Sequence, residues 1–223
     1  MPERAYRPVP LRHERPSEEE ALRRSREFLQ LMRARRSVRT FSSEPVRMAL
    51  VENAVRVAGT APSGAHQQPW TFVVVTDPEL KSRLREAAEL EEREFYERRA
   101  SPEWLEAVAR IGTDFVKAHI TDAPVVVIVF EEAWRPGRDG TKVKHYYVRE
   151  SVGIAVGFLL AALQSAGLCA LTHTPSPMGF LRELLGRPEN ERPFALIPVG
   201  YPAEQAVVPD LERKPLEQIA FFL

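Results

Sequence analysis

WTFVVVT at positions 70–76 and PVVVIVF at positions 124–130 are the segments that decide the fold. Each is a short, nearly continuous apolar run rich in β-branched residues, which is typical of a strand covered on both faces. We therefore place both segments in the centre of a sheet. Two further strands are expected at 169–174 and 194–199.

Helical patterns alternate with these strands. Ser17 followed by Glu20 forms a capping box, and the apolar spacing after it predicts a helix that ends at about Ala34. A second helix is expected to begin near Ser43 and to stop at Gly59, because glycine readily adopts the left-handed conformation that ends many helices.

The central and C-terminal parts of the chain predict three more helical regions. Residues 78–118 are highly charged and are interrupted at Ser101-Pro102, which indicates two helices with a mobile junction. Residues 146–168 are apolar nearly all round and predict a buried central helix. For the most apolar stretch, 152–171, a core helix with a following strand is expected, and a membrane span is the weaker alternative. A short helix is expected at 180–185, and an extended tail after Pro209. Helices on both sides of a sheet imply a three-layer α-β-α sandwich.

Composition limits the classes of function. The 223 residues, 44% of them hydrophobic, suffice for one domain, which we expect at 17–223 after an extended arm at 1–16. Basic and acidic residues both number 31, so neither nucleic acid nor a membrane surface is an expected partner. Cys169 is the single cysteine and the five histidines lack ligand spacing, so we expect no metal site and a cytoplasmic location.

Two basic or glycine-containing segments are candidate ligand sites. In Arg35-Arg36-Ser37-Val38-Arg39, guanidinium groups and a hydroxyl follow a helix and could converge on a phosphate. The alternative is a solvated helix end. In Pro62-Ser63-Gly64-Ala65-His66, the glycine permits close approach of a ligand to the backbone, although an ordinary turn would look the same.

Two further groups could recognise a small polar ligand. Glu92 and Tyr96 lie one helical turn apart, and together with Lys117 they could hold an amino-acid zwitterion; a salt-bridged surface helix is the alternative. Thr172, His173 and Thr174 place hydroxyls and an imidazole at a strand end, where a ligand crevice often opens. Such strand ends are also commonly simple caps.

These segments occur in an order that resembles the iodotyrosine deiodinase branch of the FMN-dependent nitroreductase superfamily. The resemblance runs from about Pro8 to the end of the chain. It rests on RRSVR at 35–39, GTAPSGAHQQPWTFVVV at 59–75, KHYYVRESVGIAVGFLLAALQSAGL at 144–168, TPSPMG at 174–179, LLGRP at 184–188, PVGYP at 198–202 and VPDLERKPL at 208–216.

The resemblance implies an α+β, nitroreductase-like sandwich with a mixed central sheet and a mobile helical lid at about 85–119. It implies that FMN is held by Arg35, Arg36, Ser37, Arg39, Pro62, Ser63, Gly64, Thr172, His173, Thr174 and Arg213. Thr174 matches the catalytic position whose hydroxyl bonds flavin N5 and favours one-electron steps. The implied substrate contacts are the backbone N–H of Ala65 and the side chains of Glu92, Tyr96 and Lys117.

The implied activity is reductive dehalogenation of 3-iodotyrosine and related halotyrosines to tyrosine and halide. The resemblance also implies a homodimer with FMN at the interface and a separate reductase as electron donor. Alternatives are a general NAD(P)H-dependent FMN nitroreductase and a flavin-binding or flavin-consuming protein without this substrate. His173 stands where the family pattern has threonine, TPSPMG is one residue shorter than the animal counterpart, and we expect no membrane anchor.

Overall fold

The computed structural model describes residues 7–223 and divides the chain into two compact units, residues 1–34 and 35–223. In the first unit, residues 7–16 form neither helix nor strand, and positions 1–6 of the expected arm lie outside the described residues. The helix α1 (Glu18–Ala34) follows within this unit. The backbone N–H of Glu20 donates to Ser17 Oγ at 3.2 Å, which confirms the predicted N-cap.

The second unit is built on a four-stranded sheet with the order β1-β2-β6-β5. All named strand pairs are antiparallel, and the parallel component of the predicted mixed sheet is an isolated bridge between Ser37 and Ala170. The strands are β1 (Trp70–Val75), β2 (Val125–Glu132), β5 (Cys169–Ala170) and β6 (Glu191–Gly200).

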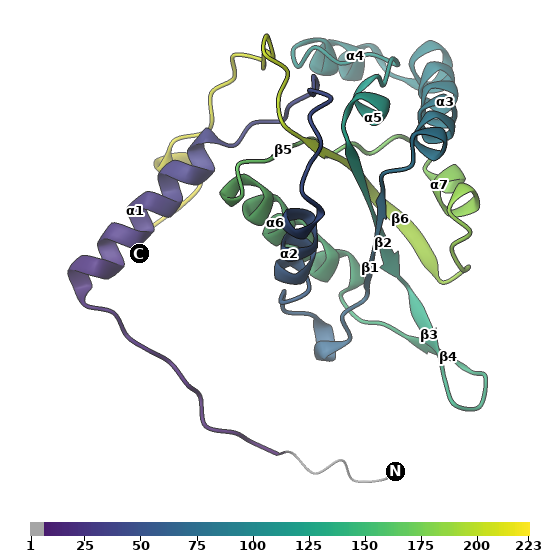
Figure 1. Ribbon diagram of the computed structural model, residues 1–223. Coiled ribbons are helices and arrows are strands. Elements are labelled where there is room, and N and C mark those ends of the chain that lie inside the picture. The colour runs from purple at the N-terminus through teal and green to yellow at the C-terminus, as the bar shows by residue number, and fades with distance from the viewer. Residues whose placement is uncertain (1–6) are drawn as a thin grey trace. The chain divides into compact units, whose positions relative to one another are not determined.

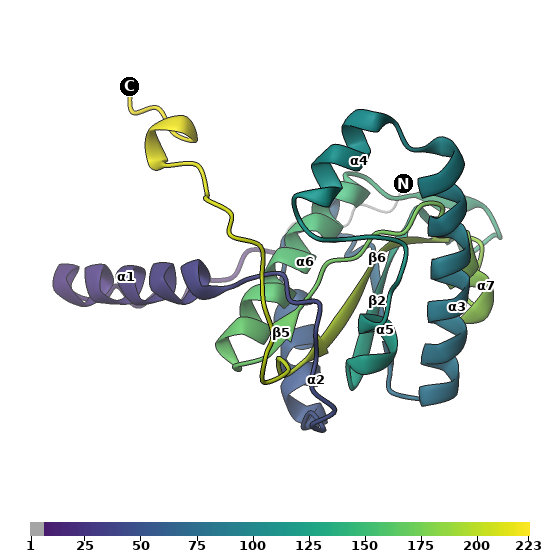
Figure 2. The same cartoon turned by 90° about the horizontal axis from the view of Figure 1, so that it is seen from above.

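Helices cover the sheet on both faces, as Figure 1 shows, so the predicted sandwich is confirmed. Side chains alternate along β2: Val125, Val127 and Val129 pack with α2 (Met48–Ala58) and α6 (Val148–Ser165). The other face of β2 packs with α3 (Pro78–Glu94), α5 (His119–Asp122) and α7 (Gly179–Leu184). Figure 2 shows the same two helical layers from above.

Two strands differ from the sequence-based expectation. β1 pairs only with β2 and lies at an edge of the sheet in this chain, so its placement in the centre was wrong. Phe72 packs against one core and Val73 and Val75 against the other, while Val74 is exposed, so contact with both helical layers does not require a second neighbouring strand. The strand expected at 169–174 is reduced to β5, after which His173 forms an isolated bridge with Leu196.

The second helix also differs at both ends. It begins at Met48 rather than near Ser43, because Pro45 disfavours helical backbone at the residue before it. Gly59 has φ −63° and ψ −14°, so it is right-handed and not the expected left-handed stop. Thr60 continues the turn instead, with its hydroxyl donating to the Val57 carbonyl at 2.7 Å.

Helix α6 is buried on one side only. Val152, Leu159 and Leu163 pack in the core, as expected of a central helix, whereas the apolar side chains of Ile154 and Phe158 are exposed in this chain. By length and composition α6 is apolar enough to cross a membrane. Its packing against β2 and α2 is that of a core helix.

The region expected to form a lid contains helices interrupted where the sequence predicted. α3 continues into the π-helix η2 (Phe95–Arg99), and α4 (Pro102–Ala109) begins after the break, with Ser101 Oγ accepting from the Trp104 N–H at 3.2 Å. The short helix expected at 180–185 is α7. The remaining elements are η1 (Gly64–His66), η3 (Leu216–Gln218) in the extended tail, and an unpredicted hairpin of β3 (Trp134–Pro136) and β4 (Lys142–Lys144).

Leu84→Ala in α3 is expected to lower the free energy of unfolding by about 2–5 kcal/mol, because a fully buried side chain leaves a cavity. Leu90→Ala is the matched control, since Leu90 lies on the same helix and is 72% exposed. It should change stability by less than about 0.5 kcal/mol. Denaturant unfolding measures both, and equal effects would contradict the assignment of the buried face of α3.

Candidate active site

A cluster of arginines lines a cavity of about 310 Å³ in the second unit. The side chains come from the segment before α2 and from the tail; the residues that line the cavity are Arg35, Arg36, Ser37, Arg39, Ile111, Pro209, Leu211, Glu212 and Arg213. Arg36 donates to the Pro209 carbonyl, and Arg213 donates to the Arg35 carbonyl at 2.7 Å. The structure thus brings Arg35, Arg36, Ser37 and Arg39 of the predicted phosphate segment together with Arg213, which the resemblance assigned to FMN binding.

These guanidinium groups repel one another. Burial lowers the pKa of Arg35, and the positive charges of Arg213 and Arg36 lower it further. Glu212 is the one acidic residue among those lining the cavity. A phosphate would relieve this repulsion and accept paired charge-assisted hydrogen bonds, so the donor set fits the phosphate of FMN.

A second cavity, of about 150 Å³, is lined by side chains of η2 and α4, in the region predicted to form a lid, and is called the lid cavity below. Arg39 and Ile111 line both cavities, which are therefore adjacent. The lid cavity gathers the predicted substrate and strand-end residues; it is lined by Arg39, Glu92, Tyr96, Trp104, Val108, Ile111, Thr113, Lys117, His119, Leu171, Thr172, His173 and Thr174.

The Glu92 carboxylate contacts two other residues that line the lid cavity. It is buried, with Oε2 at 2.5 Å from Lys117 Nζ and Oε1 at 2.7 Å from His173 Nε2. Burial by itself would raise the pKa of Glu92, but the hydrogen bonds from His173 and Lys117 outweigh it and hold that pKa below its usual value. Glu92 is therefore an anion at neutral pH.

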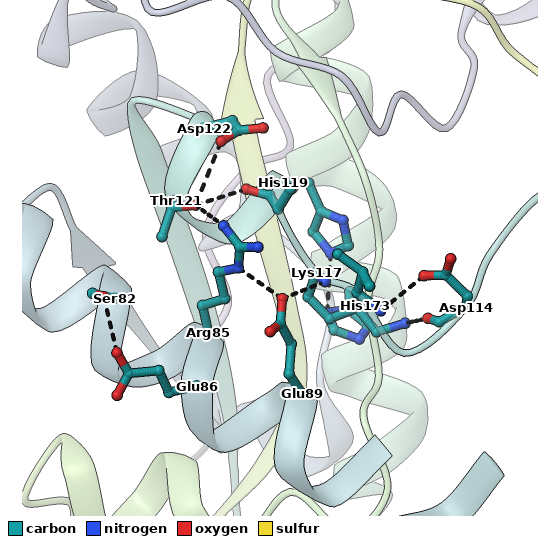
Figure 3. A network of polar contacts seen from close by, with 12 residues as sticks. Ser82, Arg85, Glu86, Glu89, Asp114, Lys117, His119, Thr121, Asp122 and His173 are labelled. Carbon is teal, nitrogen blue, oxygen red and sulfur yellow. Dashed lines mark hydrogen bonds and ion pairs between the residues drawn. The ribbon is translucent and has the colours of Figure 1, made fainter. Parts of the chain in front are cut away.

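Lys117 is held from three directions. Its Nζ pairs with Glu92 and donates to the Asp114 carbonyl, and its backbone N–H donates to Glu89 Oε1 at 2.8 Å. The same Glu89 oxygen accepts from Arg85 Nε at 2.7 Å, and Arg85 also reaches Thr121 Oγ1 at 3.0 Å. Figure 3 shows this network joining α3 to the segment that contains Lys117 and to α5. Glu89 and Glu92, both on α3, therefore hold Lys117 in position.

Aromatic packing connects η2 to α4 above the cavity. The Tyr96 and Trp104 rings meet edge to face with centroids 5.1 Å apart, and Lys117 Nζ lies 5.7 Å from the Tyr96 ring centroid. Burial raises the pKa of Tyr96, and the negative charge of Glu92 adds to this effect, so its phenol stays protonated and can donate a hydrogen bond. The π-helical turn gives Tyr96 its place, as such turns often do at functional sites.

Two buried histidines line the same cavity. His119 Nε2 lies 3.4 Å from His173 Nδ1, on the side of the His173 ring opposite Glu92. Burial lowers the pKa of His119 to about 3, with the neighbouring His173 contributing, so His119 is neutral at pH 7. Within residues 7–223, no set of three or more histidine, cysteine or acidic side chains is arranged to hold a metal ion.

The glycine-containing loop lies elsewhere. Pro62, Ser63, Gly64 and Ala65 line neither of the two cavities. The loop is held against the start of α6, with the Gly64 N–H donating to Ser151 Oγ at 3.3 Å. Ala65 has φ 50°, a left-handed conformation that costs a non-glycine residue about 1–3 kcal/mol and often marks a functional site.

Sequence reasoning missed some residues of the lid cavity. His119 and Trp104 had no distinctive spacing, and only the fold brings His119 next to His173, 54 positions later. Glu89 and Arg85, which belong to the network around Lys117 and do not line the cavity, could not be distinguished from the other charged residues of α3. A signal did exist for Glu89, since it lies three residues before Glu92 and so close to the same helical face.

The chain matches the nitroreductase family over residues 32–201. It is 59% identical over 196 residues to an iodotyrosine deiodinase of Haliscomenobacter hydrossis, which covers 88% of each chain. It is 47% identical over 212 residues to iodotyrosine deiodinase 1 of Homo sapiens, covering 95% of this chain and 73% of the human one.

Solved structures agree. The crystal structure of oxidized iodotyrosine deiodinase bound to FMN and 3-iodo-L-tyrosine superposes with a TM-score of 0.73 at 31% identity, covering 88% of this chain and 98% of that chain. An FMN-bound nitroreductase from Bacteroides fragilis shares the fold, with a TM-score of 0.64 at 22% identity over 88% of this chain and 98% of that one. The order of segments, the arginine cavity and these matches together show that the chain belongs to the iodotyrosine deiodinase branch of the nitroreductase family.

Proposed function

We propose that this protein is an FMN-dependent oxidoreductase that converts 3-halotyrosines, such as 3-iodotyrosine, to tyrosine and halide. The observation that carries the proposal is the buried pair of Glu92 and Lys117, next to the arginine cavity. Opposite charges 2.5 Å apart match the two charges of a free amino acid. The similarity to iodotyrosine deiodinases supports the same substrate class.

The arginine cavity would hold the FMN phosphate through Arg35, Arg36, Ser37, Arg39 and Arg213. The flavin ring would lie towards Thr172, His173 and Thr174, since Arg39 connects the two cavities. When bound, FMN supplies the two electrons of the reaction. Thr174 lines the lid cavity, and its hydroxyl would donate to flavin N5.

Binding of the substrate zwitterion would separate Glu92 from Lys117 and give each of them a charged group of the substrate as its new partner. Its α-ammonium replaces Lys117 beside Glu92, and its α-carboxylate accepts from Lys117 and from the Tyr96 phenol. Each buried charge keeps an opposite partner throughout, which is the condition for moving charges within a protein interior. The reaction replaces the carbon–halogen bond by carbon–hydrogen, consumes two electrons and a proton, and releases halide.

In a homodimer, the loop at 62–65 would contact the FMN and the substrate that the other subunit binds. Because the loop lines neither the arginine cavity nor the lid cavity of its own chain, a second copy would supply the Pro62, Ser63 and Gly64 contacts to FMN and the Ala65 N–H for the substrate phenolate. The exposed Ile154 and Phe158, beside Gly153 and Gly157 on α6, give an apolar face for such an interface. We include in the proposal a cytoplasmic location and a separate reductase as electron donor.

Purified protein is expected to bind FMN, to be yellow, and to elute at about twice the 25.3 kDa chain mass. After reduction by dithionite it should release iodide from 3-iodotyrosine. Iodide is measured with a selective electrode, with dithionite and free FMN as the control. Failure with every halotyrosine, combined with rapid NAD(P)H-dependent reduction of nitroarenes, would instead favour the general nitroreductase.

Lys117→Met and Glu92→Gln are expected to weaken 3-iodotyrosine binding by about 2–5 kcal/mol, because each leaves a buried charge of the ligand or protein unpaired. FMN content should be retained. Lys142→Met is the matched control, since its ammonium forms an exposed pair with Glu189 at 2.8 Å. Quenching of flavin fluorescence measures binding. Unchanged affinity in Lys117→Met would reject the zwitterion clamp while leaving the flavin site intact.

Gly64→Ala is expected to lower FMN affinity at least tenfold. A Cβ at position 64 would lie 2.7 Å from the Tyr146 carbonyl oxygen, so the loop must shift. Gly179→Ala is the control, because a Cβ there meets nothing within 4 Å. Dialysis followed by flavin absorbance compares the two variants. Equal FMN retention would show that the loop does not contact the cofactor.

A further inference from the structure

The two oxygens of the Glu92 carboxylate are held by different parts of the fold. Lys117, which precedes α5, holds Oε2 at 2.5 Å, and His173, which follows β5, holds Oε1 at 2.7 Å. All three side chains are buried, with exposed fractions of 10% or less. The carboxylate therefore has one cationic partner and one imidazole partner, and these partners are not equivalent.

The two partners behave differently when a zwitterion enters the lid cavity. Under the proposed function, Lys117 must leave Glu92 to meet the substrate carboxylate. His173 has no such role, because its Nε2 faces Glu92 and its Nδ1 faces His119. The His173 bond is then the one protein contact in this network that stays on Glu92 while the substrate ammonium arrives.

Glu92 and His119 together favour one tautomer of His173. A neutral imidazole has one N–H donor and one acceptor nitrogen. To donate to Glu92, His173 must be protonated at Nε2, which leaves Nδ1 as an acceptor for the N–H of His119 at 3.4 Å. Their rings are nearly perpendicular, at 85°, with centroids 5.0 Å apart. The two bonds have one consistent direction, from His119 to His173 to Glu92.

The surroundings keep both rings neutral. Burial lowers the pKa of His173 despite the opposing effect of Glu92, and the positive charges of Lys117 and Arg39 add to the decrease. His119 experiences the same burial and the same cations. A neutral His173 fixes the carboxylate without cancelling its charge, so Glu92 remains fully available to a second cation.

We propose that His173 is a positioning residue that orients Glu92 towards the α-ammonium of the substrate, and that His119 holds His173 in the tautomer this requires. The inference rests on the proposed function. A carboxylate without this bond is free to rotate about its terminal torsion, since such torsions are broad. It also loses a charge-assisted hydrogen bond.

The test compares a ligand that carries both charges of an amino acid with one that carries neither. FMN-loaded protein is titrated with 3-iodotyrosine and with 2-iodo-4-methylphenol, which keeps the iodophenol ring, and flavin fluorescence measures both. His173→Ala should weaken 3-iodotyrosine binding roughly 10- to 100-fold, the range of a hydrogen bond to a charged group. Binding of the iodophenol should weaken less than about threefold, because this ligand leaves Lys117 paired with Glu92 and makes no bond to that carboxylate.

A conservative variant and a spectroscopic measurement separate positioning from simple structural support. His173→Gln retains an N–H donor and should recover most of the affinity for 3-iodotyrosine. In protein labelled with ¹⁵N-histidine, the chemical shifts of His173 should report hydrogen on Nε2 at pH 7. His119→Phe keeps the bulk of the ring but removes the donor to Nδ1, and it should raise the fraction of His173 that carries hydrogen on Nδ1.

Specific outcomes overturn the inference. Equal weakening of both ligands in His173→Ala, or hydrogen on Nδ1 of His173 in the parent, shows that His173 only supports the structure. If His173→Ala loses FMN or fails to fold, the tautomer measurement and the Gln variant still decide. If the parent binds no halotyrosine at all, the proposed function fails first; if the parent binds and the variants do not discriminate, only the positioning role fails.

Discussion

A buried carboxylate has to be compensated by its neighbours, and the lid side of this protein is organised around that requirement at Glu92. Glu92 lies on α3, and its partners come from two other parts of the chain: the segment before α5 and the segment after β5. Removing an ionised carboxylate from water is costly unless charge and hydrogen bonds replace the water. Burial of the Glu92 anion therefore favours the arrangement in which Lys117 and His173 both contact it.

The central sheet makes that meeting possible. The alternation of Val127 and Ile128 on β2 sends neighbouring side chains into two separate cores, so one strand fixes helices on both faces. α3 is anchored by Leu84 and Ala88 in one of these cores, two and one turns before Glu92. The arginine cavity lies beside the lid cavity because the segment that contains Arg39 contributes to both.

Sequence reasoning predicted the features that depend on local chemistry. The Ser17 cap, the break at Ser101 and the layered architecture all follow from short-range patterns, and each was confirmed. The position of β1 at the edge was not predictable, because an apolar run shows that both faces are covered but does not reveal the number of strand neighbours. Gly59 was misjudged because its right-handed backbone depends on how Thr60 continues the turn.

In the candidate site too, only the features that depend on neighbouring positions in the sequence were predictable. The one-turn spacing of Glu92 and Tyr96 was readable, but the pairing of Glu92 with both Lys117 and His173 exists only in the folded chain. This pairing has a consequence for selectivity. A ligand that lacks either charge of an amino acid would separate Glu92 from Lys117 without replacing both partners, and the desolvation cost of the unpaired group would oppose its binding. The pair of Glu92 and Lys117 thus disfavours aromatic ligands that carry only one of the two charges of an amino acid.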